Sequence, residues 1–327
     1  MKYETLLDNF KEKRILVIGD VMLDAYILGN VTRVSPEAPV PVVSLSKKEN
    51  RIGGAGNVAL NLKNLGAKPI IASVIGNDTD GAILEELFVK RGISTLGLVK
   101  SAKRKTTVKT RVISAKQQLL RIDSEDIHPI DDKHEAKLLQ KVEELISKEI
   151  DAIILEDYDK GILNQKNIAL IISLAQANNI PITADPKKEN FHYYKGLTLF
   201  KPNLKELKDG LNIDFNFATE HNKFNDAVNA LRHSIPHEVS LITLSEHGVY
   251  VCDAESSARI PAHKREITDV SGAGDTVIAV ATLCLLAKAN IQDIAKISNI
   301  AGGMVCERPG VVSISLQELK NEVRELL

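Results

Sequence analysis

The chain has 327 residues, which at about 150 residues per domain allows one large or two ordinary domains. Its 42 basic and 43 acidic side chains give a formal net charge of −1, which argues against a generally basic protein that binds nucleic acid or a membrane surface. Apolar residues make up 44% and charged residues 26%. This mix excludes a largely disordered chain and supports a sizeable core.

The N-terminal segment is charged and lacks the apolar stretch of a signal peptide, and no run of 18 apolar residues predicts a membrane span. Three cysteines are too few for a disulfide framework. We therefore expect a cytoplasmic protein with reduced cysteines and with neither membrane nor nucleic-acid partners.

Short branched apolar runs that end in polar residues predict buried strands along most of the chain. These strands are expected at 15–18, 69–76, 151–157, 181–185, 197–203 and 239–245. Apolar residues at helical spacing predict helices at 56–65, 78–91, 164–178, around 218–234, and at 274–288, 291–306 and 315–326. Strands alternating with helices predict an α/β fold, with a mainly parallel sheet and helices on both faces.

Two segments break this rhythm. Residues 26–51 alternate between apolar and polar and contain three prolines, which suits an edge strand or a projecting ribbon. Residues 104–123 also alternate, with a turn near Ala115, and predict a hairpin or ribbon. Together the two segments could form a small β-sheet beside the main domain.

The strongest local signal is a glycine-rich turn, Ser271 to Gly274, that opens directly into an apolar helix. Unpaired backbone N–H groups at the positive end of a helix bind anions. Asp275 lies in the first turn of this helix, where it could simply favour the helix dipole. The turn combines two glycines and a carboxylate with a helix that is apolar on every side. This combination is more typical of a reaction centre in the protein interior than of a carboxylate that only stabilises the helix.

A second glycine cluster, Gly53, Gly54 and Gly56, precedes a predicted helix and is followed by Asn57. It could let a ligand approach the backbone, or it could be a tight turn with an N-cap. The sequence contains neither the G-x-G-x-x-G pattern nor a P-loop, which disfavours a Rossmann dehydrogenase and a P-loop NTPase.

Polar residues follow several predicted strands, at the edge where open α/β sheets bind their ligands. They are Asp20 with Asp24, Glu156-Asp157, Asp185 with Lys187, Lys201 with Asn203, and Ser245-Glu246. Each alone is weak evidence, but five together predict a site at this edge.

These residues together resemble the ribokinase-like (pfkB) carbohydrate kinase family over essentially the whole chain. The segments that carry the resemblance are GGAGNVA (53–59), NLKE (203–206) and DVSGAGDT (269–276). The resemblance implies a three-layer α/β/α sandwich with a small β-sheet lid, as a single domain over 1–327 with lid segments at 26–51 and 104–123. It also implies ATP and Mg²⁺ as cofactors.

The resemblance implies that Asp275 is the general base and that Gly272, Ala273 and Gly274 supply anion-binding amides. The nucleotide and its hydrated Mg²⁺ would be bound by Asn203, Leu204, Lys205, Glu206, Ser245, Gly248 and Asn299. The sugar phosphate would be bound by Asp24, Gly53, Gly54, Asn57, Lys109, Arg111, Asp185 and Lys187. Asp269 and Ser271 stand where relatives bind a monovalent cation such as K⁺.

Within the family, GDVMLDAY (19–26), TRVSPEAPVPVV (32–43) and EDYDKG (156–161) are most similar to the D-glycero-β-D-manno-heptose 7-phosphate kinases. The sequence departs from them at Glu156 and Asp159, where Ser and Gly are usual, and from common family residues at Lys201 and Ser245. The alternatives are another pfkB kinase, for ribose, fructose or a fructose phosphate, or a non-catalytic nucleotide or sugar sensor.

The chain ends at Leu327, soon after the last kinase helix, so we expect the kinase reaction without a nucleotidyltransferase domain. The lid would expose strand edges that need covering. We therefore expect a homodimer that pairs the lids of two subunits.

Overall fold

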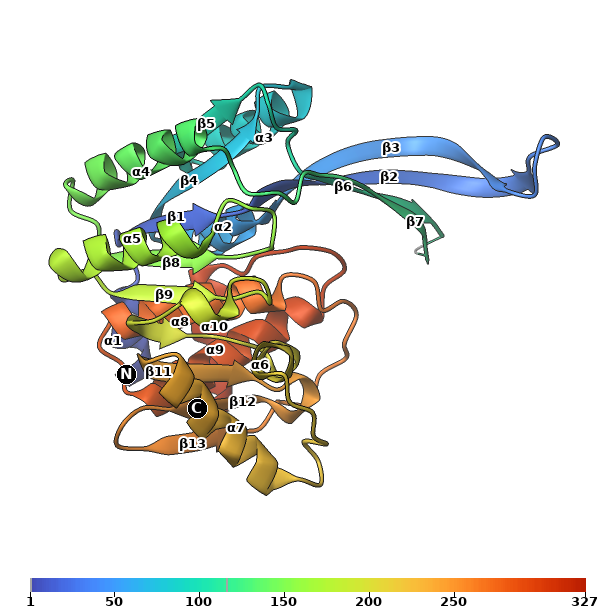
Figure 1. Cartoon of the computed structure of the whole chain (residues 1–327). Helices are drawn as coiled ribbons and strands as arrows, with labels where there is room; N and C mark the ends of the chain where they lie inside the picture. The colour runs from blue at the N-terminus through green and yellow to red at the C-terminus, as the bar shows by residue number, and fades with distance from the viewer. Residues whose placement is uncertain (1, 116) are drawn as a thin grey trace.

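The computed structural model describes residues 2–115 and 117–327 and contains two β-sheets (Figure 1). The larger sheet has nine strands in the order β13-β12-β11-β10-β9-β8-β1-β4-β5. Their bounds are β1 Arg14–Gly19, β4 Lys68–Gly76, β5 Ser94–Ser101, β8 Ala152–Glu156, β9 Ile182–Asp185, β10 Leu197–Phe200, β11 His237–Thr243, β12 Val249–Cys252 and β13 Ser257–Ile260. The strands from β11 to β5 pair in parallel, whereas β12 and β13 are antiparallel additions at one edge.

The central strands are apolar throughout because helices cover both faces of the sheet. In β1, Ile15 and Val17 belong to one core cluster, whereas Leu16 and Ile18 belong to the other. The first cluster receives helices α1 Lys2–Asp8, α2 Ala55–Asn64, α3 Thr79–Lys90, α8 Ala273–Leu286, α9 Ile291–Cys306 and α10 Leu316–Leu326. The second receives α4 Asp132–Ile146, α5 Gln165–Ala177, α6 Leu204–Leu211 and α7 His221–Ser234. The predicted α/β three-layer architecture is confirmed.

The smaller sheet, here called the lid sheet, has the order β3-β2-β6-β7 and projects from one side of the main domain (Figure 1). Its strands are β2 Val21–Val34, β3 Pro41–Gly54, β6 Val108–Ser114 and β7 Gln117–Ser124. Both segments predicted to form a separate sheet contribute to it. Strands β2 and β3 are longer than the predicted 26–51 segment, because they begin directly after β1 and run into α2.

The helix predicted around residues 218–234 is confirmed as α7, but the prediction omitted α6 from the segment between β10 and β11. The structure has α6 and α7 there, separated by a loop that begins at Asn212. Asn212 ends α6 in the left-handed conformation, with φ of 52°, which Asn tolerates better than most residues. The prediction also omitted α1, α4, β5, β12 and β13. Two short 3₁₀ helices, at Phe191–Tyr193 and Ser245–His247, complete the set of elements in the described residues.

No helix among the residues that the structure describes is long and apolar enough to cross a membrane.

Candidate functional site

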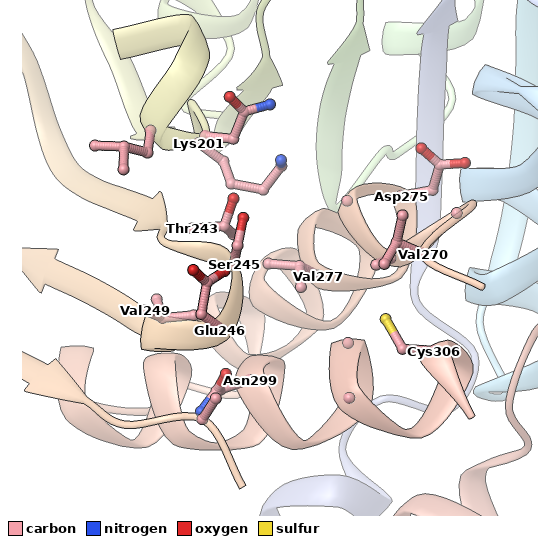
Figure 2. A pocket seen from close by; sticks show the side chains of 18 of the residues that line it. Lys201, Thr243, Ser245, Glu246, Val249, Val270, Asp275, Val277, Asn299 and Cys306 are labelled. Carbon is pink, nitrogen blue, oxygen red and sulfur yellow. The ribbon is translucent and has the colours of Figure 1, made fainter. Parts of the chain in front are cut away.

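A cavity of about 860 Å³ lies at the carboxyl ends of the parallel strands, beside the start of α8 and one face of α9 (Figure 2). It brings together twelve residues that the sequence predicted for the site. They are Asp185, Lys187, Asn203, Leu204, Lys205, Glu206, Ser245, Gly272, Ala273, Gly274, Asp275 and Asn299. Residues that stand up to 114 positions apart in the chain, from Asp185 to Asn299, thus meet at one sheet edge, because parallel strands all end on the same side.

Helix α8 begins at this cavity with an exposed positive end. Its N-cap is Gly272, which has φ of 81° and supplies no side-chain cap. The Ala273 amide donates to Val270 O at 3.3 Å, so the amides that follow it in the first turn are the ones without a cap. A Cβ atom on Gly274 would lie 3.4 Å from Asp185 Oδ2 and 3.6 Å from Lys201 Nζ. An anion at this helix end would therefore meet both the backbone amides and the Lys201 ammonium group.

Asp275 lies in the first turn of α8 and is buried. Its Oδ2 accepts a 2.6 Å hydrogen bond from Asn57 Nδ2, and its Oδ1 accepts a 2.6 Å hydrogen bond from the Tyr158 hydroxyl. Burial raises the pKa of the Asp275 carboxyl, and these two hydrogen bonds act against that rise. The carboxylate is held in one orientation and keeps further lone pairs to accept a proton.

Glu156 and Asp185, at the ends of β8 and β9, form a carboxylate cluster with Asp275. One oxygen of each lies within 4.8 Å of the others. Both Glu156 oxygens and Asp185 Oδ1 are buried without a hydrogen-bond partner. Burial, and after it the charge of Asp185, raise the pKa of Glu156 well above its usual range. Oxygen-only donors of this kind suit a hard divalent cation such as Mg²⁺.

Two lysines, the buried Lys201 and the partly exposed Lys187, offset part of this negative charge. Lys201 Nζ lies 2.7 Å from Asp185 Oδ2, and Lys187 forms an ion pair with Glu206. Burial alone would lower the pKa of each lysine, but Asp185 and Glu206 raise both. The two ammonium groups therefore stay charged at the wall of the cavity.

The start of α6 is fixed by a capping box. Asn203 Oδ1 accepts from the Glu206 amide at 2.8 Å, and Glu206 Oε2 accepts from the Asn203 amide at 2.8 Å. The Asn203 side-chain amide keeps its N–H donors for a ligand, and Leu204 also lines the cavity. Lys205 lines the rim, but its ammonium group pairs with Asp209 at 2.5 Å.

The far end of the cavity is bounded by the turn after β11 and by α9. Ser245 has φ of 53°, in the left-handed region, and Asn299 donates to Pro261 O at 2.8 Å (Figure 2). Gly248 is not among the lining residues. A Cβ atom there would lie 2.0 Å from Ile260 O, so this glycine is required by the close packing of β13.

The residues predicted for the sugar occupy the lid sheet and the start of α2 and, apart from Asp185 and Lys187, do not line this cavity. Asp24 forms an ion pair with Arg111, and Gly53 faces the pair: a Cβ atom on Gly53 would lie 2.4 Å from Asp24 Oδ2. Gly54, with φ of 60°, carries the chain from β3 into α2. Gly53 and Gly54 thus end β3, so the alternative of a tight turn at this glycine cluster is wrong.

Asn57 and Lys109 complete this side of the site. Asn57 is fully buried, and its Oδ1 has no hydrogen-bond partner, which leaves it free to accept from a ligand hydroxyl. Lys109 lies two residues before Arg111 on β6 and therefore on the same face of the lid sheet. Burial lowers the pKa of Lys109.

Asp269 and Ser271 lie beside the start of α8 rather than on the cavity wall. Asp269 Oδ1 accepts from the Ser271 amide at 2.9 Å, and Oδ2 accepts from the Gly310 amide at 2.9 Å. Burial raises the pKa of Asp269, but these hydrogen bonds outweigh it and the net shift is downward.

Sequence reasoning missed two residues that the structure brings into the site. Tyr158 reaches Asp275 from the loop after β8, and Arg265 lines the cavity while pairing with Glu307 and Glu322. Tyr158 stands next to polar residues at a strand end, a signal that could have found it. Nothing in the sequence around Arg265 distinguishes it from a surface cation.

The chain matches the pfkB family carbohydrate kinase model over residues 12–318. It is 40% identical over 309 residues to the bifunctional protein HldE of Aliarcobacter butzleri, covering 94% of this chain and 64% of that protein. It is 37% identical over 307 residues to the bifunctional protein HldE of Helicobacter pylori, covering 94% of this chain and 65% of that protein. The chain thus spans about two thirds of the length of these relatives.

Solved structures share the fold. A crystal structure of phosphofructokinase-2 from Escherichia coli in complex with potassium matches with a TM-score of 0.78 at 19% identity, covering 97% of this chain and 99% of that one. A structure of Arabidopsis thaliana ribokinase complexed with ribose and ATP matches with a TM-score of 0.73 at 14% identity, covering 96% and 99%. The fold, the glycine-rich start of α8 and the family match agree, and this chain belongs to the pfkB family of carbohydrate kinases.

Proposed function

We propose that this chain is an ATP-dependent sugar kinase that phosphorylates D-glycero-β-D-manno-heptose 7-phosphate at O1, giving the 1,7-bisphosphate. The observation that carries the kinase reaction is the buried Asp275 carboxylate, set at the uncapped positive end of α8 in a cavity that can admit a nucleotide. The heptose assignment rests on the motifs of the lid and substrate side and on the identity of about 40% to the HldE proteins.

In this reaction Asp275 accepts the proton of the sugar hydroxyl as that oxygen forms its bond to the γ-phosphorus of ATP. The bond from the γ-phosphorus to ADP breaks on the opposite side. Phosphoryl transfer has a loose transition state, so the protein acts mainly by positioning groups and stabilising charge. The amides of Gly272, Ala273 and Gly274 and the Lys201 ammonium group are placed to stabilise the charge on the transferred group.

The residues present fit a divalent cation, because the cavity holds buried carboxylate oxygens without partners. Mg²⁺ would be held near Glu206, Asp185 and Glu156, and when bound it neutralises phosphate charge. Asn203 and Asn299 would bind the nucleotide from the two ends of the cavity. Asp269 and Ser271 are the candidates for a monovalent cation.

Substrate recognition would fall to the lid sheet. Arg111 and Lys109 lie on one face of β6, and arginine binds phosphate through two parallel N–H donors. Closure of the lid sheet would exclude water from the transferred phosphoryl group.

A homodimer would cover the other face of the lid sheet. Leu120 and Ile122 on β7 are 55% and 51% exposed and lie on one face, two residues apart. A second copy of the same sheet offers a matching apolar surface, which favours pairing of lids.

The test is ADP release with ATP·Mg²⁺ against heptose 7-phosphate, fructose 6-phosphate, fructose, ribose and no sugar. We expect the highest kcat/KM with heptose 7-phosphate. Higher turnover of another sugar would contradict the assignment of heptose 7-phosphate as the substrate, but it would agree with the proposed role of Asp275 as the base. Binding of ATP without turnover of any sugar would favour a sensor.

A further inference from the structure

The loop after β8, residues 157–162, carries Tyr158 into the site and does not behave as an ordinary surface connection. Its Tyr158 hydroxyl donates to Asp275 Oδ1 at 2.6 Å, whereas Asn57 donates to the other oxygen from α2. Each oxygen of the Asp275 carboxylate therefore accepts a hydrogen bond from a different donor, and the two donors, Asn57 and Tyr158, stand 101 positions apart in the chain. Neither donor is a charged group that could exchange its proton with Asp275 at neutral pH.

The loop is built around a second buried carboxylate, Asp20, which follows β1. Asp20 Oδ2 accepts from the amides of Tyr158 at 2.8 Å and Lys160 at 3.1 Å, and Oδ1 accepts from the Ile162 amide at 3.1 Å. Asp20 is 1% exposed, so these three bonds are shielded from water. They fix the backbone on both sides of the Tyr158 side chain.

Contacts from two other parts of the chain also hold the loop. Asp157 accepts from the Tyr194 hydroxyl at 2.7 Å and from Asn190 Nδ2 at 3.0 Å. The Arg104 guanidinium donates to Lys160 O and, at 2.8 Å, to Asp126 O. A short loop with this many buried polar bonds is preorganised, which is what positions a reacting group accurately.

We propose that Tyr158 is a positioning residue, which with Asn57 holds the Asp275 carboxylate in the orientation that accepts the sugar hydroxyl proton. The role rests on the proposed kinase function. The carboxylate has lone pairs beyond those used by its two donors, so the substrate hydroxyl can bind while both donors stay in place. The Asp20-centred loop acts through Tyr158 and does not itself touch the substrate.

The test compares Tyr158→Phe with Tyr194→Phe in steady-state assays with heptose 7-phosphate and ATP. Both variants remove one hydroxyl that donates to a carboxylate of the same network, but only Tyr158 reaches Asp275. A hydrogen bond to a charged group that sets catalytic geometry is worth about 10- to 100-fold in rate. We expect kcat of Tyr158→Phe to fall by that factor, with both KM values within about threefold of wild type.

Tyr194→Phe should keep more than about half of the wild-type kcat, since its hydroxyl donates to Asp157 and not to Asp275. ADP affinity and the thermal unfolding midpoint, measured on both variants, report whether the site is folded. The proposal is overturned if Tyr158→Phe keeps a third of wild-type kcat, or if both variants lose kcat equally. Absence of turnover in the wild-type chain on every sugar tested would instead overturn the proposed function, and this role with it.

Discussion

Arg111 on β6 and Asp24 on β2 form an ion pair between neighbouring strands of the lid sheet, although they stand 87 positions apart in the chain. The Asp24 side chain is 4% exposed and that of Arg111 is 17% exposed. Each was predicted separately as a sugar contact. Their pairing means that a substrate phosphate at Arg111 and a substrate hydroxyl at Asp24 would bind to one preformed unit.

Replacing Arg111 with Ala should raise KM for the phosphorylated sugar by at least about tenfold, because a charge-assisted phosphate contact is lost. KM for ATP should change by less than about twofold, since Arg111 is on the lid sheet and not on the cavity wall. Arg324→Ala is the control, because this exposed arginine lies on α10, outside the lid sheet, and pairs with Glu4. Equal rises in both KM values would contradict the assignment.

Asp275→Asn should fold normally and lose about 10²- to 10⁴-fold in kcat, the usual contribution of a positioned general base. Asn keeps the shape of the side chain and one acceptor oxygen for Tyr158 or Asn57. Steady-state kinetics give the loss, and ADP binding by calorimetry checks that the nucleotide site remains. A variant that retains more than a tenth of wild-type kcat would show that Asp275 is not the base.

The acidic loop beside Tyr158 predicts a stability that depends on pH. Burial, and after it the charges of Asp157 and Glu189, raise the pKa of Asp159 to about 6. Because the folded state holds this proton more tightly than the unfolded state, the ionised form opposes folding, and the penalty grows between about pH 4 and pH 6. Above pH 6 the penalty is fully present.

Asp159→Asn should therefore raise the thermal unfolding midpoint by about 1–3 °C at pH 8, and most of that gain should vanish at pH 4. Asn also suits the left-handed backbone of this position, which has φ of 53°. Asp131→Asn is the control, and its expected effect on stability has the opposite sign. Hydrogen bonds from His134 lower the pKa of Asp131 to about 2, so the ionised form of this carboxyl favours the folded state. Asp131→Asn should therefore destabilise the protein at pH 8, and a gain there would refute the argument.

Ile122→Glu should convert the proposed dimer to a monomer, because it places a charge in the apolar face that a second lid sheet would cover. Light scattering after size-exclusion chromatography measures the mass. Leu96→Glu on β5, at a residue 63% exposed on an edge strand of the main sheet, should leave the mass unchanged. A wild-type chain that runs as a monomer would reject lid pairing.

The α/β class and the start of α8 could be predicted from local sequence patterns. Residues 15–18 and 152–155 are continuous apolar runs, and only a sheet covered on both faces buries such strands completely. Ser271 to Gly274 followed by Asp275 likewise needs no tertiary information, because a glycine-rich turn before an apolar helix leaves its amides free for an anion.

Which of the predicted residues contact one another could not be predicted from those patterns and depends on the folded chain. Asp24 meets Arg111, Asn57 meets Asp275, and Lys201 meets Asp185 because separate strands and helices end at one edge of the sheet. The folded chain also decided the role of Tyr158, whose hydroxyl reaches Asp275 only because Asp20, 138 positions earlier, fixes the loop that carries it. Local sequence patterns show only the spacing of residues along the chain. These contacts join residues that are distant in the chain, so they depend on how strands and helices pack together in the folded protein.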